Sequence, residues 1–226
     1  MNKVPGDRAL QLEISERTNW QSFFDDRERS CPIFVLAPDE NLNEWAHDGV
    51  LGGQRALDIG CGNGRNAIYL AKRGFEVDAV DQSVSAVRWA REEVGRAGVS
   101  VAVHCTSIFD FQHRAGTYDF VYDCGCFHHI PPHQRTRYVQ LVSSALKPGG
   151  AFGLVCFTPD GGNNFSDDQV YERGSLGWGL GYDEERLRQL WGAAFDIRVF
   201  RQMRNQPEGA ELFGKDFLWT MLARRK

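Results

Sequence analysis

Residues 55–66 carry the feature that most limits how this chain can fold: a short apolar strand that leads through a glycine-rich turn into a helix. The turn has a glycine at every second position, Gly60, Gly62 and Gly64. Glycine adopts backbone conformations closed to other residues and lets main-chain N–H groups approach a ligand closely. Because a helix begins directly after the turn, a ligand held there would lie near the positive end of its dipole. The segment predicts a ligand-binding strand–turn–helix unit.

A second strand is predicted over residues 75–80. It ends at Asp81, and Gln82 and Ser83 open the next helix. In doubly wound α/β folds, a glycine turn after one strand and an acid at the end of the next, about twenty residues later, together hold a nucleoside. The spacing therefore predicts a nucleoside site.

Two residues indicate which nucleoside. A dinucleotide site favours a third glycine where this chain has Arg65, since that glycine lets the helix pack closely beneath a pyrophosphate. Asp58 lies at the end of the first strand, two residues before the turn. A carboxylate there would repel a pyrophosphate but would suit a ligand that carries an ammonium and a sulfonium. A nicotinamide oxidoreductase is therefore disfavoured.

Residues 57–64, Leu-Asp-Ile-Gly-Cys-Gly-Asn-Gly, resemble the first motif of the class I S-adenosylmethionine-dependent methyltransferases. The resemblance implies S-adenosylmethionine as the cofactor and S-adenosylhomocysteine as its product. It also implies that Asp81 binds the ribose hydroxyls. The cofactor-binding candidates at the two motifs are Asp58, Gly60, Cys61, Gly62, Asn63, Arg65, Asn66, Asp81, Gln82 and Ser83.

The segment after the third strand is where this family binds adenine, often with an acid followed by an apolar residue. Here Ser107 takes the place of the acid and Ile108 and Phe109 follow it, while Asp110 is the nearest carboxylate. We expect Ser107, Ile108 and Phe109 to line the adenine pocket.

Strands and helices alternate along most of the chain. Strands are predicted near 55–59, 75–80, 99–104, 118–123 and 150–157, and helices near 64–73, 83–97 and 133–146. That alternation predicts a parallel sheet with right-handed crossovers. After a helix that starts at Asp183, segments 195–203 and 216–223 are typical of an antiparallel hairpin. The resemblance then implies an α/β, Rossmann-like, doubly wound sheet of seven strands, mostly parallel, with an antiparallel C-terminal hairpin strand.

The N-terminal part is predicted to be helical over residues 8–29, with a second helix capped at Asp39 and running to about Asp48. We expect residues 1–50 to form a helical lid and residues 51–226 a single methyltransferase domain, with a loop insertion at 158–182. Trp20 and Phe24 are the predicted cofactor contacts of the lid, together with Arg27. The alternative is an amphipathic helix that packs its aromatic side chains on the sheet.

The segment at residues 118–132 is the predicted reaction site, because the carboxyl ends of parallel strands face the ligand crevice. The resemblance places Asp123 and Cys124 at the strand end, next to the cofactor. His128 and His129 follow as catalytic candidates, since an imidazole titrates near neutral pH and can accept a proton. Either histidine can instead serve only to shape the loop. Base catalysis is not obligatory, because alignment with an activated methyl donor supplies much of the acceleration.

The predicted methyl acceptor is a small molecule. The Asn-Pro-Pro-Tyr type of motif used to methylate nucleobase amines is absent, and the aromatic N-terminal segment resembles small-molecule methyltransferases of the thiopurine and tellurite-resistance type. A thiol or another chalcogen nucleophile is slightly preferred. The alternatives are an oxygen or nitrogen acceptor in a biosynthetic pathway, or a non-catalytic protein that binds the cofactor for regulation.

Composition narrows the remaining possibilities. A length of 226 residues suits one α/β domain, and a net charge of −4 gives no general attraction to nucleic acid. No apolar run is long enough to cross a bilayer, and a signal peptide is not evident, so we expect a cytoplasmic protein without a membrane partner. The six cysteines lack a metal-ligand spacing, so no metal site is predicted. We expect a monomer or a weak homodimer.

Overall fold

The structure, a computed structural model, describes residues 6–226. Residues 1–5 of the predicted lid segment lie outside the described residues. Seven strands form one sheet in the order β3-β2-β1-β4-β5-β7-β6. The parallel strands are β1 (Arg55–Ile59), β2 (Glu76–Asp81), β3 (Val101–Cys105), β4 (Tyr118–Cys124) and β5 (Leu146–Phe157). Strand β7 (Leu218–Arg225) is antiparallel to both β5 and β6 (Phe195–Gln202). The predicted fold class is confirmed.

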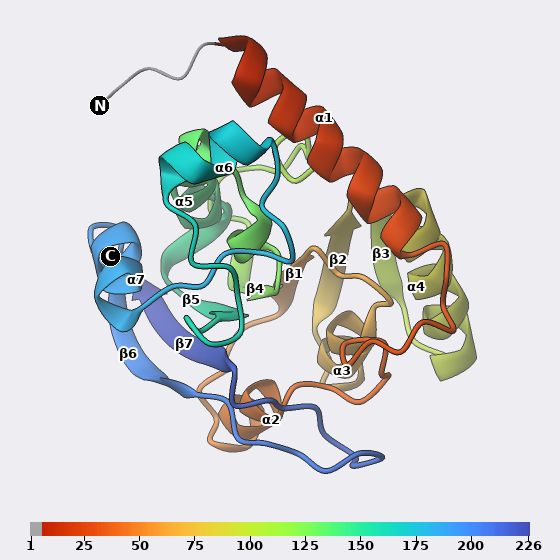
Figure 1. Ribbon diagram of the computed structural model, residues 1–226. Helices are drawn as coiled ribbons and strands as arrows, with labels where there is room; N and C mark the ends of the chain where they lie inside the picture. The colour runs from red at the N-terminus through yellow and green to blue at the C-terminus, as the bar shows by residue number, and fades with distance from the viewer. Residues whose placement is uncertain (1–5) are drawn as a thin grey trace.

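Helices cover both faces of the sheet and give a three-layer molecule (Figure 1). On one face lie α2 (Glu40–His47), α3 (Arg65–Lys72) and α4 (Val84–Ala97). On the other lie α5 (Arg135–Ala145), α6 (Asp167–Arg173) and α7 (Glu184–Trp191), with two short 3₁₀ helices, η1 (Phe127–His129) and η2 (Pro132–Gln134), leading into α5. Each face has its own apolar core, because every central strand alternates its buried side chains between the two layers.

Helix α1 (Gly6–Phe23) lies on the outside of the molecule and runs from α6 to α4 (Figure 1). It ends earlier than the predicted helix over 8–29. The chain turns there because Phe24 is buried against α4 and Arg27 pairs with Glu92 of α4, with 2.6 Å between Nη1 and Oε2. The end of the first helix is thus set by its docking on α4.

Two further predictions differ from the structure. The segment at 158–182 is not a continuous loop, because it contains α6, which starts with a capping box between Ser166 and Gln169. Strand β5 starts at Leu146 instead of residue 150, and residues 147–150 form an irregularity within it, where the register to β4 shifts. Both changes leave the order of the parallel strands intact.

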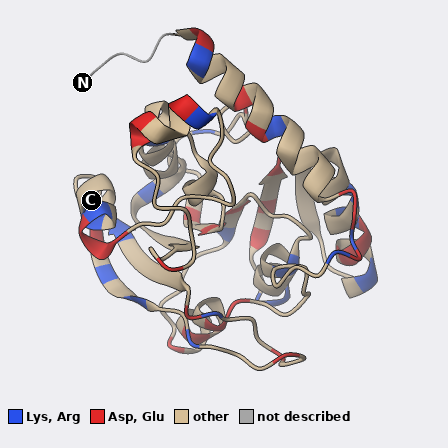
Figure 2. Ribbon diagram, in the orientation of Figure 1, with Lys and Arg blue, Asp and Glu red and all other residues tan. Residues whose placement is uncertain are grey.

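Lys and Arg residues are interspersed with Asp and Glu residues along the visible helices (Figure 2). Within residues 6–226, no helix combines the length and the apolar character that crossing a membrane requires.

Candidate active site

The glycine turn after β1 directs its main-chain N–H groups toward the end of β2. Gly60 and Cys61 both donate to the Val80 carbonyl, at 2.8 and 3.1 Å. Gly62 donates to the Asp81 carboxylate at 3.0 Å. These three N–H groups are therefore committed within the protein, and the turn is not arranged as a phosphate cradle. This arrangement agrees with the argument from Arg65 against a dinucleotide.

Asp81 lies at the end of β2, next to the turn. Its carboxylate accepts hydrogen bonds from the main chain of Gly62 and of Ser83, at 3.0 and 2.9 Å. Burial raises the pKa of Asp81, and these hydrogen bonds oppose the rise. A carboxylate has about four acceptor positions, so Asp81 keeps the capacity to accept from ligand hydroxyls.

Asp58 is the most informative side chain of the site. It is 1% exposed at the end of β1, and its Oδ2 has no hydrogen-bond partner among the described residues. The nearby Arg65 guanidinium and the N–H of Ala67, both in the first turn of α3, favour its charged form. Burial raises the pKa of Asp58 to about 7, and the nearby Asp39 carboxylate adds to the rise. A buried carboxylate oxygen without a partner is costly unless a cation or donor pairs with it, and the cofactor's ammonium is such a group.

Three polar residues of the predicted cofactor motif have other partners. The side chain of Asn63 donates to the Val35 carbonyl at 2.9 Å, and that of Arg65 donates to the Ala37 carbonyl at 2.8 Å. Asn66 donates to the Asp39 carboxylate at 3.0 Å. All three side chains thus hold the strap, by which we mean residues 35–39, against the glycine turn.

The end of β4 is fixed by Asp123. Its carboxylate accepts from the main-chain N–H groups of Cys126 and Phe127 at 2.8 and 3.0 Å, and from the Tyr138 hydroxyl at 2.5 Å. Burial raises the pKa of Asp123 to about 7, against the effect of these hydrogen bonds. Cys124 follows, with its Sγ 3.3 Å from Nη2 of Arg65, and burial raises the pKa of this thiol well above its usual range. Asp123 therefore shapes the loop that carries the two histidines.

His128 and His129 form one aromatic group. Their ring centroids are 4.3 Å apart, and His128 stacks on Phe157 at 4.0 Å. The Phe157 N–H donates to Nδ1 of His128 at 3.2 Å, which leaves the proton of the neutral ring on Nε2. Burial lowers the pKa of His128 well below its usual range and that of His129 to about 3. Both rings are neutral at physiological pH.

Two segments far apart in the sequence cover the histidine pair. Trp20 of α1 makes an edge contact with His129, with centroids 4.4 Å apart. From the other side, Gly179 approaches so closely that an added Cβ would lie 2.7 Å from both imidazole rings. Glu16 of α1 joins the two segments by accepting from the Leu176 N–H at 3.1 Å.

Phe24 lies over the glycine turn, since an added Cβ at Gly62 would be 3.5 Å from its ring. It also stacks on Phe34 near α4. Trp20 and Phe24 thus lie beside His129 and the glycine turn respectively, and their predicted contact with the cofactor stays a prediction.

The remaining predicted residues border the turn after β3 and the start of α4. Ile108 is buried, and Ser107 caps the turn by accepting from the Phe109 N–H at 3.3 Å. Ser83 is the N-cap of α4 and accepts from Ala86, while Gln82 is partly exposed beside it. The sequence did not reveal Asp39 as a residue of the site, because its position before α2 was accounted for by a role as helix cap. Its side chain makes no cap hydrogen bond.

Among residues 6–226, no group of three or more His, Cys, Asp or Glu side chains is arranged to hold a metal ion.

Comparisons with known proteins agree with this geometry. A family model described as "Methyltransferase domain" matches residues 56–150. A 2-heptyl-1-hydroxyquinolin-4(1H)-one methyltransferase of Mycobacteroides abscessus is 29% identical over 155 residues, which cover 65% of this chain and 68% of that protein. A ubiquinone biosynthesis O-methyltransferase of Xanthomonas axonopodis pv. citri is 34% identical over 103 residues, which cover 45% and 42%. The chain spans about half the length of most of the curated relatives it matches first.

The fold has solved counterparts. The crystal structure of 1,6-didemethyltoxoflavin-N1-methyltransferase from Burkholderia thailandensis, with bound 1,6-didemethyltoxoflavin and S-adenosylhomocysteine, superposes with a TM-score of 0.70 at 19% identity. The superposition covers 100% of this chain and 92% of the other. Together with the strand order, these matches show a methyltransferase domain over residues 56–150 and the Rossmann-like fold of the class I S-adenosylmethionine-dependent methyltransferases.

Proposed function

We propose that this protein transfers a methyl group from S-adenosylmethionine to a small molecule. The observation that carries the proposal is the Asp58 carboxylate, which is buried at the end of β1 with one oxygen left without a partner among the described residues. The methyltransferase domain over residues 56–150 supports S-adenosylmethionine as the ligand that provides the missing cation.

Each part of the cofactor has a candidate holder. We assign the ammonium to Asp58, the ribose hydroxyls to Asp81 and the adenine ring to the segment around Ser107 and Ile108. We assign Asn63, Arg65, Asn66 and Asp123 a supporting role, because their side chains are occupied inside the protein. Residues 6–50 would act as the lid over this site, through Trp20 and Phe24.

The cofactor, when bound, supplies an activated methyl group on a sulfonium. The residues of this chain then have to orient the acceptor and exclude water, and alignment of that kind supplies much of the acceleration in such reactions. His128, His129, Trp20 and Phe157 form an aromatic wall beside the end of β4 that suits both tasks.

For the acceptor, we favour a thiol or another chalcogen nucleophile. Efficient general bases have pKa values near the working pH, whereas burial lowers the pKa of His129 to about 3 and that of His128 well below its usual range. Neutral imidazoles of this kind are poor proton acceptors, which favours a nucleophile that ionises without much help. A thiol has a pKa near 8.5 and meets that condition better than a phenol or an alcohol.

An oxygen acceptor is the second candidate, because one relative is named as an O-methyltransferase and another is named for a substrate with a hydroxyl group. One is a methyltransferase of a 1-hydroxyquinolinone and the other an O-methyltransferase of ubiquinone biosynthesis. An acidic hydroxyl would also need little general-base assistance.

The test is methyl transfer from isotope-labelled S-adenosylmethionine to matched acceptors that differ in one atom, such as thiophenol, phenol and aniline, with His129→Gln as a parallel variant. Transfer confined to the thiol, with little loss in the variant, would support the first candidate. Transfer to the phenol that falls at least about tenfold in the variant would support oxygen and base catalysis. Tight binding of S-adenosylhomocysteine without transfer to any acceptor of a broad panel would favour a regulatory binding protein instead.

A further inference from the structure

Asp39 is a buried carboxylate in the strap, outside the parallel sheet. It has no exposed surface, although acidic residues are seldom fully buried without partners. Its Oδ1 is 2.6 Å from Nη1 of Arg65, and its Oδ2 accepts from Asn66 at 3.0 Å and from the Tyr122 hydroxyl at 2.6 Å. The Asp39 N–H in turn donates to the side-chain oxygen of Asn66 at 3.1 Å. One carboxylate thus joins α3 to β4.

The partners of Asp39 border both halves of the candidate site. Arg65 and Asn66 are the first two residues of α3 and follow the glycine turn directly. Tyr122 precedes Asp123 in β4, and the Arg65 guanidinium, held by Asp39, also reaches Cys124 Sγ at 3.3 Å. A displacement of Arg65 would therefore shift both the turn after β1 and the end of β4.

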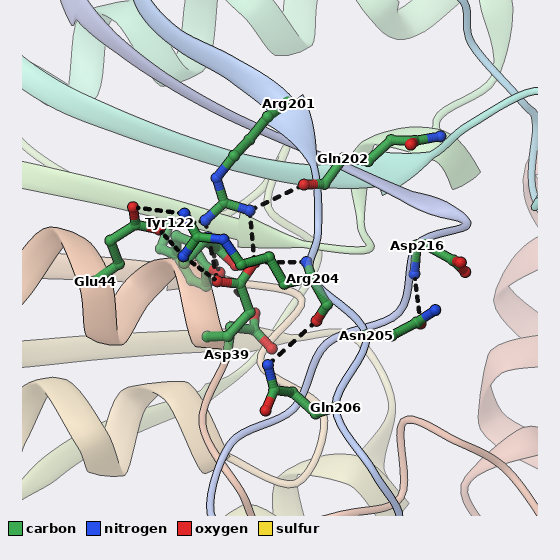
Figure 3. Close-up of polar contacts among 11 residues, drawn as sticks. Asp39, Glu44, Tyr122, Arg201, Gln202, Arg204, Asn205, Gln206 and Asp216 are labelled. Carbon is green, nitrogen blue, oxygen red and sulfur yellow. Dashed lines mark hydrogen bonds and ion pairs between the residues drawn. The ribbon is translucent and has the colours of Figure 1, made fainter.

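The strap itself has a second, independent attachment. The Glu40 N–H donates to the Phe213 carbonyl at 2.8 Å, and the Phe213 N–H donates to the Pro38 carbonyl at 2.8 Å. Beyond this bridge, the Glu40 carboxylate pairs with Arg201, at 2.7 Å between Oε1 and Nη1. Figure 3 shows Arg201 and Arg204 beside Glu44, with which both also pair. Because main-chain bonds hold residues 38–40, a change of the Asp39 side chain alone leaves the strap attached to the body of the protein.

We propose that Asp39 is a positioning residue of the methyl-transfer site, which acts through Arg65, Asn66 and Tyr122 to fix the glycine turn against the end of β4. The proposal rests on the proposed function and names a residue of that same site. An ion pair with a merely structural role would change stability alone, whereas a positioning pair also changes the affinity for the cofactor.

Asp39→Asn is the variant that separates these roles, because it keeps the shape and removes the charge. Glu40→Gln is its matched control, because it makes the same chemical change at the next residue. Glu40 is also buried and ion-paired, but it faces Arg201 and Arg204 instead of α3. We expect Asp39→Asn to weaken S-adenosylhomocysteine binding, measured by calorimetry, at least about tenfold, since it leaves a buried guanidinium without its counter-charge. Glu40→Gln should stay within about twofold of the unmodified protein at a similar loss of melting temperature.

A double variant tests the route through Arg65. If Asp39 acts through that guanidinium, Asp39→Asn combined with Arg65→Met should bind no more weakly than Arg65→Met alone. Strictly additive losses in the double variant would overturn that route. Equal affinities of Asp39→Asn and the unmodified protein, with both folded, would overturn the positioning role, as would equal losses in Asp39→Asn and Glu40→Gln.

Tyr122→Phe covers the case in which Asp39→Asn fails to fold. It removes the hydrogen bond from the Tyr122 hydroxyl to Asp39 and the one that this hydroxyl accepts from Asn41, and it keeps the ion pair. We expect a two- to fivefold weaker affinity, about the effect of one hydrogen bond, and a melting temperature lower by a few degrees. Unchanged affinity in that variant would count against the proposal. Failure of the unmodified protein to bind S-adenosylhomocysteine at all would instead overturn the proposed function, and the positioning role with it.

Discussion

At the scale of single residues, the two acids at the ends of β1 and β2 have opposite environments. Asp81 is satisfied by main-chain N–H groups, whereas Asp58 keeps one oxygen without a partner among the described residues. The first is thus preorganised to accept hydrogen bonds from hydroxyls, and the second to accept a cation. Their functions can be separated by single substitutions.

Replacement of Asp81 by alanine should weaken S-adenosylhomocysteine binding by at least about 100-fold, because hydrogen bonds to a charged group contribute about 1.5–3 kcal/mol each. His128→Ala should leave this affinity within a few-fold of the unmodified protein, since its ring faces Phe157 and His129. Calorimetric titration of both variants checks the prediction. Similar losses in the two variants would contradict the assigned roles.

Asp58→Asn should stabilise the protein without cofactor while it weakens cofactor binding. The folded-state pKa of Asp58, about 7, lies above its ordinary value of 3.8, so this group favours the native state below pH 3.8 and that contribution is lost as pH rises through 7. At pH 8 the cost of ionisation is roughly 2–4 kcal/mol. In thermal unfolding at pH 5 and pH 8, the melting temperature of Asp58→Asn should exceed that of the unmodified protein by a margin that grows with pH. A margin that shrinks with pH would contradict this account.

At the scale of elements, the strands follow from the sequence, but the segments that cover the site do not. Apolar runs such as residues 56–59 and the glycines after them specify β1 and its turn by local rules, and all seven strands were predictable from such signals. Helix α6 was missed because it is short and polar, although its capping box, Ser166 with Gln169, is a readable signal. The hydrogen bonds of Asn63, Arg65 and Asn66 to the strap were not predictable. Each partner lies about 27 residues away in sequence, and the two segments meet only in the folded protein.

The segment between α6 and α7 is predicted to position the histidine pair. Gly179 has a φ of +108°, and Gly179→Ala would drive a Cβ into both imidazole rings. Because displacements near 1 Å are enough to cost about 100-fold in rate, we expect kcat to fall about 10- to 100-fold, with S-adenosylhomocysteine affinity nearly unchanged. Steady-state kinetics with the best acceptor provide the measurement.

Gly174→Ala is the matched control for that prediction. Gly174 also has a positive φ, +63°, but nothing lies within 4 Å of an added Cβ. Alanine at position 174 would carry the same kind of backbone strain, about 1 kcal/mol, without contacting the histidines. An equal loss of kcat in both variants would point to strain in the segment and not to the histidine contact.

At the scale of the whole molecule, the site is built from a parallel sheet and closed by segments from both ends of the described chain. S-adenosylhomocysteine should therefore stabilise the entire fold by mass action, by about 2.7 kcal/mol at 100 times its Kd. For a protein of this size, that corresponds to an increase in melting temperature of roughly 5–10 °C. NAD should produce no shift. Stabilisation by NAD alone would contradict the proposed cofactor.

The hydrogen bond between Glu16 and Leu176 bears on how the chain folds during its synthesis. The two residues are 160 positions apart, and Glu40 likewise bonds to Phe213 near the other end. At ribosomal rates of about 5–20 residues per second, Leu176 and Phe213 emerge roughly 10–30 s after the residues of α1 and the strap to which they bind. The aromatic side chains of α1 find their partners earlier, since Trp20 contacts His129 and Phe23 contacts Phe34. The lid and the strap therefore form these hydrogen bonds only after residues 176 and 213 have been synthesised.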